Sequence, residues 1–208
     1  MTELMREVYV VTQSRVSLSE LSSDTTLHER NIMTLYTVLG MGLLFVGAVL
    51  VVNGIWLLGG AANRDTAVLN FLVGGLTLLI ALWWAFGGDA SAGTAFNAAG
   101  TLLFAFTYLW VGANAYWDAE DQRSFGWYCL FVTLVTIPTG WLVLGLGDVG
   151  LAALWWIWGL LWAGFWLLLA LERAEYTTGV AWYAIAVGIS TGVAGYVMAA
   201  GLWPWAPA

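Results

Sequence analysis

Six long apolar segments constrain this chain more than any other feature of its sequence. They lie at about residues 34–58, 66–87, 95–116, 125–146, 149–171 and 179–203, and none contains an acidic residue, a basic residue or histidine. A helix needs roughly 20 mostly apolar residues to cross a bilayer, whereas a membrane β-strand needs about 10 that alternate with polar ones. We therefore expect an all-α, polytopic membrane protein with six transmembrane helices.

The rarity of charged residues indicates that the chain is embedded in lipid, and the composition also excludes several classes of functional site. They make up 9% of the 208 residues, against roughly 25% in a soluble domain. No lysine is present to form a Schiff base, and the single Cys129 and single His28 exclude an intrachain disulfide and bis-histidine haem ligation. We find no nucleophile–base pair or phosphate loop. The sequence therefore predicts no cofactor, metal, nucleic-acid partner or enzymatic activity.

The arginines predict the orientation. Arg64, Arg123 and Arg173 lie in the first, third and fifth loops, while the second and fourth loops carry only Asp89 and Asp148. Because cytoplasmic loops carry the excess of basic residues, the odd loops should be cytoplasmic and both chain ends outside.

Residues 1–33 are set apart from the six-helix channel domain expected over 34–208. They are polar, carry three arginines and lack the apolar core of a signal peptide. Either translation begins at Met33 or Met41, or the tail is a short external or interfacial segment.

Weak internal repeats indicate three helical hairpins in tandem. The pair Gly74 and Thr77 corresponds, 59 residues later, to Thr133 and Thr136, and 55 residues further on to Gly188 and Thr191. Small residues at such positions are typical of packed membrane helices, and the axis of a quasi-repeated bundle is a natural place for a pore.

Tryptophan is unusually frequent, with 15 residues. Eight lie near predicted helix ends, as expected of interfacial anchors: Trp56, Trp83, Trp84, Trp117, Trp127, Trp182, Trp203 and Trp205. In the fifth segment, by contrast, Trp155, Trp158 and Trp162 share one helix face, and Phe104 and Tyr108 form an i, i+4 pair in the third. These rings either pack between helices or line a pathway.

A pathway lined by such rings would suit a flat, uncharged solute. Asn53 offers both a donor and an acceptor for such a solute, or else an interhelical hydrogen bond. Thr136 and Pro138 indicate a kink in the fourth segment. Because proton-coupled transporters usually keep an acid or histidine within the membrane, the apolar segments favour passive diffusion.

Motifs in five of the segments follow one another between about residues 40 and 203. They are Gly42–Leu50 with Asn53–Ile55, Thr66–Phe71 with Val73–Leu76, Leu102–Leu109, Trp127–Val132 with Thr136–Pro138, and Trp155 with Trp158–Trp162. In this order they resemble the AmiS/UreI family of urea and short-chain amide channels.

The resemblance implies six-helix protomers, each with its own pore, in a ring-shaped homohexamer whose centre is filled with lipid. It implies a multi-pass protein of the prokaryotic cell membrane with both ends outside, functionally linked to a cytoplasmic urease or amidase. It assigns selectivity to Phe104, Tyr108, Trp155, Trp158, Trp162 and Asn53, and an apolar constriction to Val46, Leu50 and Leu161.

The chain also departs from acid-activated members of that family, which carry histidines in their external loops. Here the only histidine is His28, so histidine-based acid gating is not expected. Val187 stands where the sixth helix of such a channel has an acidic residue, and Leu151 replaces a tryptophan.

The leading hypothesis is a passive channel for urea or short aliphatic amides. A channel for another small neutral solute, such as ammonia or water, is one alternative, and a membrane scaffold or regulatory subunit with a closed centre is another. Aromatic side chains that fill the centre completely would favour the scaffold, whereas a continuous path beside Trp158 and Tyr108 would favour the channel.

Overall fold

The computed structural model describes residues 33–87 and 92–206 and contains, within these ranges, six helices long and apolar enough to cross a membrane. They are the first helix (Met33–Leu57), α2 (Asn63–Phe86), α3 (Ala92–Tyr116), α4 (Arg123–Gly145), α5 (Val149–Leu169) and α6 (Thr177–Ala199), with the short 3-10 helix η1 (Ala174–Tyr176) leading into α6. The expected six-helix fold is therefore confirmed. The tail 1–32 lies outside the described residues.

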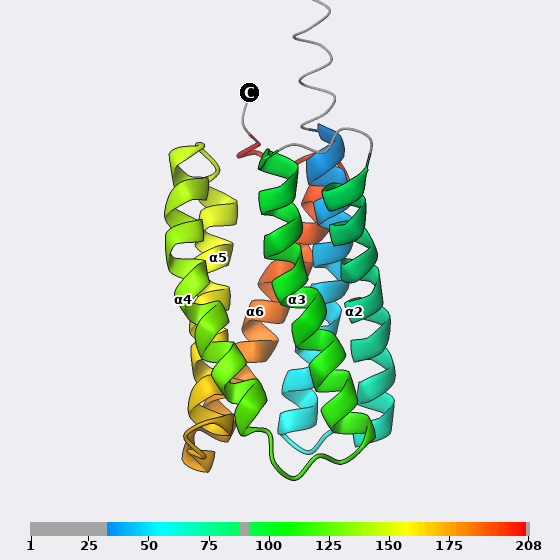
Figure 1. Cartoon of the computed structure of the whole chain (residues 1–208), viewed down its shortest axis with the longest axis vertical. Helices are drawn as coiled ribbons and strands as arrows, with labels where there is room; N and C mark the ends of the chain where they lie inside the picture. The colour runs from blue at the N-terminus through cyan, green and yellow to red at the C-terminus, as the bar shows by residue number, and fades with distance from the viewer. Residues whose placement is uncertain (1–32, 88–91, 207–208) are drawn as a thin grey trace, which may run out of the picture.

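The helices run side by side as a single up-and-down bundle (Figure 1). α2 packs along α3, and α4 packs along α5. The first helix packs along α6, so the two ends of the helical region meet and close the bundle. In the three predicted hairpins, which are the first helix with α2, α3 with α4, and α5 with α6, each of these contacts joins one hairpin to the next. The start of the first helix and the end of α6 lie at the same end of the bundle.

Glycine permits the close approach of the first helix to α6. Gly40, Gly47 and Gly54 recur at every seventh residue, on nearly one face of the helix. A Cβ at Gly47 would overlap the backbone of Gly192, and one at Gly54 would lie 2.7 Å from the carbonyl oxygen of Ala181. Lipid-embedded helices gain little from apolar burial, so such backbone contact supplies much of their attraction.

Hydrogen bonds between helices supplement these contacts. The Asn53 and Asn70 side chains donate to one another, at 3.1 and 2.7 Å, and join the first helix to α2. The Tyr128 hydroxyl donates to the carbonyl oxygen of Leu103 at 2.9 Å and joins α4 to α3. Buried polar groups have no water to bind in lipid, so each satisfied pair fixes how two helices meet.

The fourth helix continues through Pro138 without interruption. Proline cannot donate to the carbonyl one turn earlier. On either side of that carbonyl, the Thr136 hydroxyl donates to Thr133 O at 2.7 Å and the Thr139 hydroxyl to Val135 O at 2.8 Å. Near Pro138, the hydroxyl groups of Thr136 and Thr139 thus supplement the backbone hydrogen bonds of α4.

Most of the tryptophans predicted as interfacial anchors are exposed or half-buried near helix ends, but two are not anchors of this kind. Trp84 is only 4% exposed and packs with Ile80 and Ala98, so the expectation for it is wrong. Trp203 is half-buried, and its indole N–H donates to Asp148. Trp84 turns inward to line a cavity at its end of the bundle, described below, and Trp203 is held by its bond to Asp148.

Replacing Gly47 with alanine should destabilise the bundle, because the new methyl group meets helix backbone that cannot move aside. We expect a loss of about 1–3 kcal/mol in the free energy of unfolding, the range for overpacked sites, measured by denaturant titration of the detergent-solubilised protein. Gly75→Ala is the matched control, since a Cβ at Gly75 meets nothing within 4 Å. Equal stability of the two variants would contradict the assigned packing.

Candidate permeation pathway

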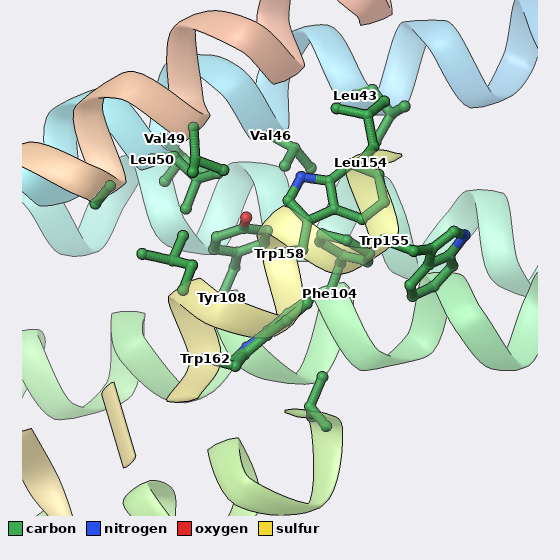
Figure 2. Close-up of a cluster of buried hydrophobic side chains, with 14 of the residues drawn as sticks. Leu43, Val46, Val49, Leu50, Phe104, Tyr108, Leu154, Trp155, Trp158 and Trp162 are labelled. Carbon is green, nitrogen blue, oxygen red and sulfur yellow. The ribbon is translucent and has the colours of Figure 1, made fainter. Parts of the chain in front are cut away.

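Aromatic side chains from α3 and α5 form the centre of the bundle. Trp155, Trp158 and Trp162 lie on the buried face of α5, and Phe104 of α3 meets all three rings. Its ring centroid lies 4.8 Å from that of Trp158 and 4.9 Å from that of Trp162, both edge to face. Figure 2 shows this cluster opposite Val46 of the first helix. The rings therefore touch edge to face and leave no flat slot between them.

The central indoles are held by hydrogen bonds, whereas Phe104 is not. Trp158 Nε1 donates to the Thr191 hydroxyl of α6 at 2.9 Å, and Trp162 Nε1 donates to the Thr107 hydroxyl of α3 at 3.2 Å. Phe104 has no polar group and is retained by ring contacts alone. Phe104 can therefore turn away without breaking a hydrogen bond, as can Trp155, whose indole N–H has no hydrogen-bond partner among the described residues.

An outer cavity of about 250 Å³ lies on the side of this cluster nearer the chain ends. Its wall is mostly apolar, with a few hydroxyl, amide and carboxylate groups. The lining residues are Leu35, Tyr36, Leu39, Gly42, Leu43, Val46, Thr77, Ile80, Trp84, Phe96, Asn97, Gly100, Thr101, Phe104, Val143, Leu146, Asp148, Leu151, Trp155 and Trp158. Phe96 and Leu146 are exposed at the end of the bundle, so the cavity reaches the surface there.

An inner cavity of about 30 Å³, which is large enough to hold a water molecule, lies on the other side of the cluster. It is lined by Leu50, Asn53, Phe104, Thr107, Tyr108, Val111, Phe125, Trp158, Leu161, Trp162 and Phe165. The Tyr108 hydroxyl belongs to this wall and has no hydrogen-bond partner among the described residues. This hydroxyl is therefore available for a hydrogen bond with a polar group of a small solute.

The two cavities share only Phe104 and Trp158. Because these rings touch, they form a barrier between the cavities, and the pathway is closed in this conformation. The centre is therefore neither completely filled, as expected of a scaffold, nor continuously open beside Trp158 and Tyr108.

All nine residues predicted for the pore line one or both cavities. Val46 and Trp155 line the outer cavity, Phe104 and Trp158 line both, and Leu50, Asn53, Tyr108, Leu161 and Trp162 line the inner one. For Asn53 the two interpretations left open are compatible, because its amide is paired with Asn70 and still contributes to the wall.

Several polar residues of these walls could not be identified from the sequence, above all Asp148, which lies in a predicted loop and yet is only 1% exposed. An aspartate just before an apolar segment is a signal for a helix N-cap, and Asp148 does cap α5. Nothing in the sequence indicated that Tyr36 and Trp203 would meet its carboxylate. Thr107 and Thr191 gave no signal of their hydrogen bonds to the indoles.

The charged residues gather mainly at the opposite end of the bundle, where Arg64, Arg123 and Arg173 all lie. Arg123 binds Asp121 through two side-chain hydrogen bonds of 3.0 and 2.7 Å. These bonds lower the pKa of Asp121 to about 2, so this carboxylate stays ionised at physiological pH.

Comparisons with known proteins agree with this architecture. The AmiS/UreI family transporter model matches residues 38–201. A Mycolicibacterium smegmatis protein named for the transport of amidate substrates is 37% identical over 172 residues, which cover 81% of this chain and 79% of that protein. The acid-activated urea channel of Helicobacter pylori is 34% identical over 185 residues, covering 74% and 92% of the two chains.

A solved structure shares the same fold. The crystal structure of the Helicobacter pylori urea channel matches with a TM-score of 0.68 and 30% identity, covering 76% of this chain and 96% of the other. The cryo-EM structure of the Helicobacter pylori urea channel in a closed state matches with a TM-score of 0.67 and covers 79% of this chain and 99% of the other. With a family match over most of its length, six membrane-spanning helices and two cavities meeting at an aromatic barrier, this chain belongs to the AmiS/UreI family of transporters.

Proposed function

We propose that this protein is a passive channel for urea or short aliphatic amides and catalyses no reaction. The observation that carries the proposal is the pair of cavities that approach each other from opposite sides and are separated by a single aromatic contact, Phe104 to Trp158. The relatives named for amidate transport and for urea conduction support the choice of solute.

Passage requires Phe104 to turn away from the anchored indoles. Each edge-to-face contact contributes about 0.5–1.5 kcal/mol beyond area burial, so parting the three contacts with Trp155, Trp158 and Trp162 costs about 1.5–4.5 kcal/mol. A state at that free energy is populated often enough for transient opening. The barrier therefore acts as a thermally opened constriction that needs no energy input.

The walls of the pathway favour small neutral amides over ions. The barrier offers nothing that replaces the hydration shell of an ion, which is therefore excluded. A small amide loses fewer water contacts and can exchange them for the Tyr108 hydroxyl and other polar groups of the inner wall, while its flat face lies against the rings.

The outer cavity and the unpartnered Tyr108 hydroxyl argue against a closed scaffold, because a scaffold gains nothing from space beside its central rings. Ammonia and water remain the competing solutes, since both are small enough for the inner cavity. A solute comparison separates these possibilities from amide conduction.

Orientation and assembly follow the same reasoning. The three arginines at one end of the bundle favour that end as cytoplasmic, with the outer cavity and both chain ends facing outside the prokaryotic cell membrane. A cytoplasmic urease or amidase would consume the solute. Apolar side chains exposed around the bundle, among them Leu72, Leu79, Ile189 and Val193, suit contact with lipid and with further copies in a homohexameric ring.

Native mass spectrometry of the detergent-solubilised protein tests the assembly. We expect a mass six times that of the chain, with bound lipid retained by the ring. A monomer or dimer under conditions that preserve the helical fold would overturn the hexamer and leave the single-chain pathway intact.

The solute is tested by stopped-flow light scattering on proteoliposomes, with urea, acetamide and glycerol compared from pH 5 to 8. We expect urea and acetamide to enter at least several-fold faster than in empty liposomes, with little pH dependence.

Tyr108→Phe should slow amide entry about three- to tenfold, as expected for one lost hydrogen bond. Trp182→Ala, at an exposed tryptophan, is the control. Wild-type entry no faster than in empty liposomes, from protein shown to be folded, would refute the channel.

The barrier is tested at Phe104. Phe104→Ala removes a ring that lines both cavities and should raise urea permeability several-fold and admit glycerol, because the cavities then join. Phe104→Trp should lower both, since the larger ring fills the junction. Amide permeability unchanged in Phe104→Ala would show that the barrier lies elsewhere.

A further inference from the structure

The outer cavity contains a buried carboxylate, Asp148, that the pathway described above does not use. Its Oδ1 accepts the backbone N–H of Leu151 at 2.8 Å. Its Oδ2 accepts the Tyr36 hydroxyl at 2.7 Å and the Trp203 indole N–H at 2.9 Å. One aspartate thus joins the first helix, the N-terminus of α5 and the segment after α6.

Among the described residues, no basic side chain is paired with Asp148. The two ion pairs found there, Arg123 with Asp121 and Arg173 with Glu175, are exposed and lie at the opposite end of the bundle. Hydrogen bonds and the N-terminus of α5 stabilise the carboxylate instead. Burial of a charge without a counter-ion is unfavourable, and the three hydrogen bonds to Asp148 offset part of that cost.

The carboxylate and the tyrosine together present hydrogen-bond acceptors to the cavity. Tyr36 uses its proton in the bond to Asp148, so its oxygen has only lone pairs left for a ligand. Oδ1 of Asp148 accepts one bond and retains a second acceptor site. Both residues line the outer cavity. Such a wall attracts N–H groups and repels anions.

The same cavity wall includes a buried donor without a partner. Trp84 lines the cavity, and its indole N–H has no hydrogen-bond partner within residues 33–87 and 92–206. A buried N–H left unpaired is unfavourable, and a ligand carbonyl oxygen would satisfy it. Acceptors and a donor in one apolar cavity match a molecule that carries both NH₂ and C=O groups.

We propose that Asp148 and Tyr36 form an outer binding site that accepts hydrogen bonds from the N–H groups of a urea or primary-amide solute before it reaches the Phe104–Trp158 barrier. The site rests on the proposed function and deepens it, because it selects for solutes with N–H donors. It stands apart from the aromatic barrier, on the side of the chain ends.

Two matched variants separate a binding role from a structural one. Tyr36→Phe and Trp203→Phe each remove one hydrogen bond to the same carboxylate oxygen, but only Tyr36→Phe removes an acceptor from the binding site. Urea and acetamide entry into proteoliposomes is measured at low solute concentration, with osmotic water permeability measured on the same vesicles. Asp148→Asn is the third variant, and size-exclusion chromatography checks the fold of all three.

We expect Tyr36→Phe to slow urea and acetamide entry about three- to tenfold, as for the loss of one hydrogen bond, without a change in water permeability. Trp203→Phe should stay within about twofold of the wild type, and Asp148→Asn should be slowed at least as much as Tyr36→Phe. If Trp203→Phe and Tyr36→Phe are slowed equally, the carboxylate only anchors the last segment and the site is refuted. If neither is slowed while the wild type conducts amides, the site is refuted and the channel stands. A wild type that conducts no amide refutes the channel itself.

Discussion

The close packing of the first helix against α6 determines whether the rest of the structure can form. In lipid, apolar side chains gain little by leaving their solvent, so helices associate where backbones come close or hydrogen bonds cross between them. Gly40, Gly47 and Gly54 allow that approach over about four turns of the first helix. Because this contact joins the two ends of the helical region, it closes the bundle and confines the large rings of α3 and α5 to its centre.

The aromatic rings at the centre differ in whether a hydrogen bond holds them in place. Threonines on neighbouring helices bind the indoles of Trp158 and Trp162, so these rings are fixed relative to α6 and α3. Phe104 packs against both with nothing but its faces and edges. Two anchored indoles beside an unanchored phenyl ring give a barrier that is closed in this conformation and that can open without the loss of a hydrogen bond.

The sequence was informative about segments and much less informative about pairings. The six helices and the inward aromatic face of α5 followed from the lengths of charge-free runs and from the spacing of Trp155, Trp158 and Trp162. These signals are local, so they survive any arrangement of the helices. The hydrogen bonds of Thr191 and Asp148 depend on which helices become neighbours, and no local pattern encodes that. Trp84 was misread for the same reason, since position near a helix end cannot distinguish lipid from a cavity.

The polar groups along the pathway explain how a neutral amide can be favoured while the barrier itself remains apolar. The carboxylate of Asp148 lies in the outer cavity. Asp148 directly precedes α5, whereas Trp158 lies near the middle of that helix, so about half of α5 separates the carboxylate from the Trp158 ring. A charge placed beside the rings would offer a cation a partner at the point of greatest dehydration. Placed at the outer end, it can attract N–H groups, yet an ion that lingers there still meets Phe104 and Trp158 without ligands. Selection by hydrogen bonding and exclusion by dehydration are thus separated along the bundle, and each can be strong without weakening the other.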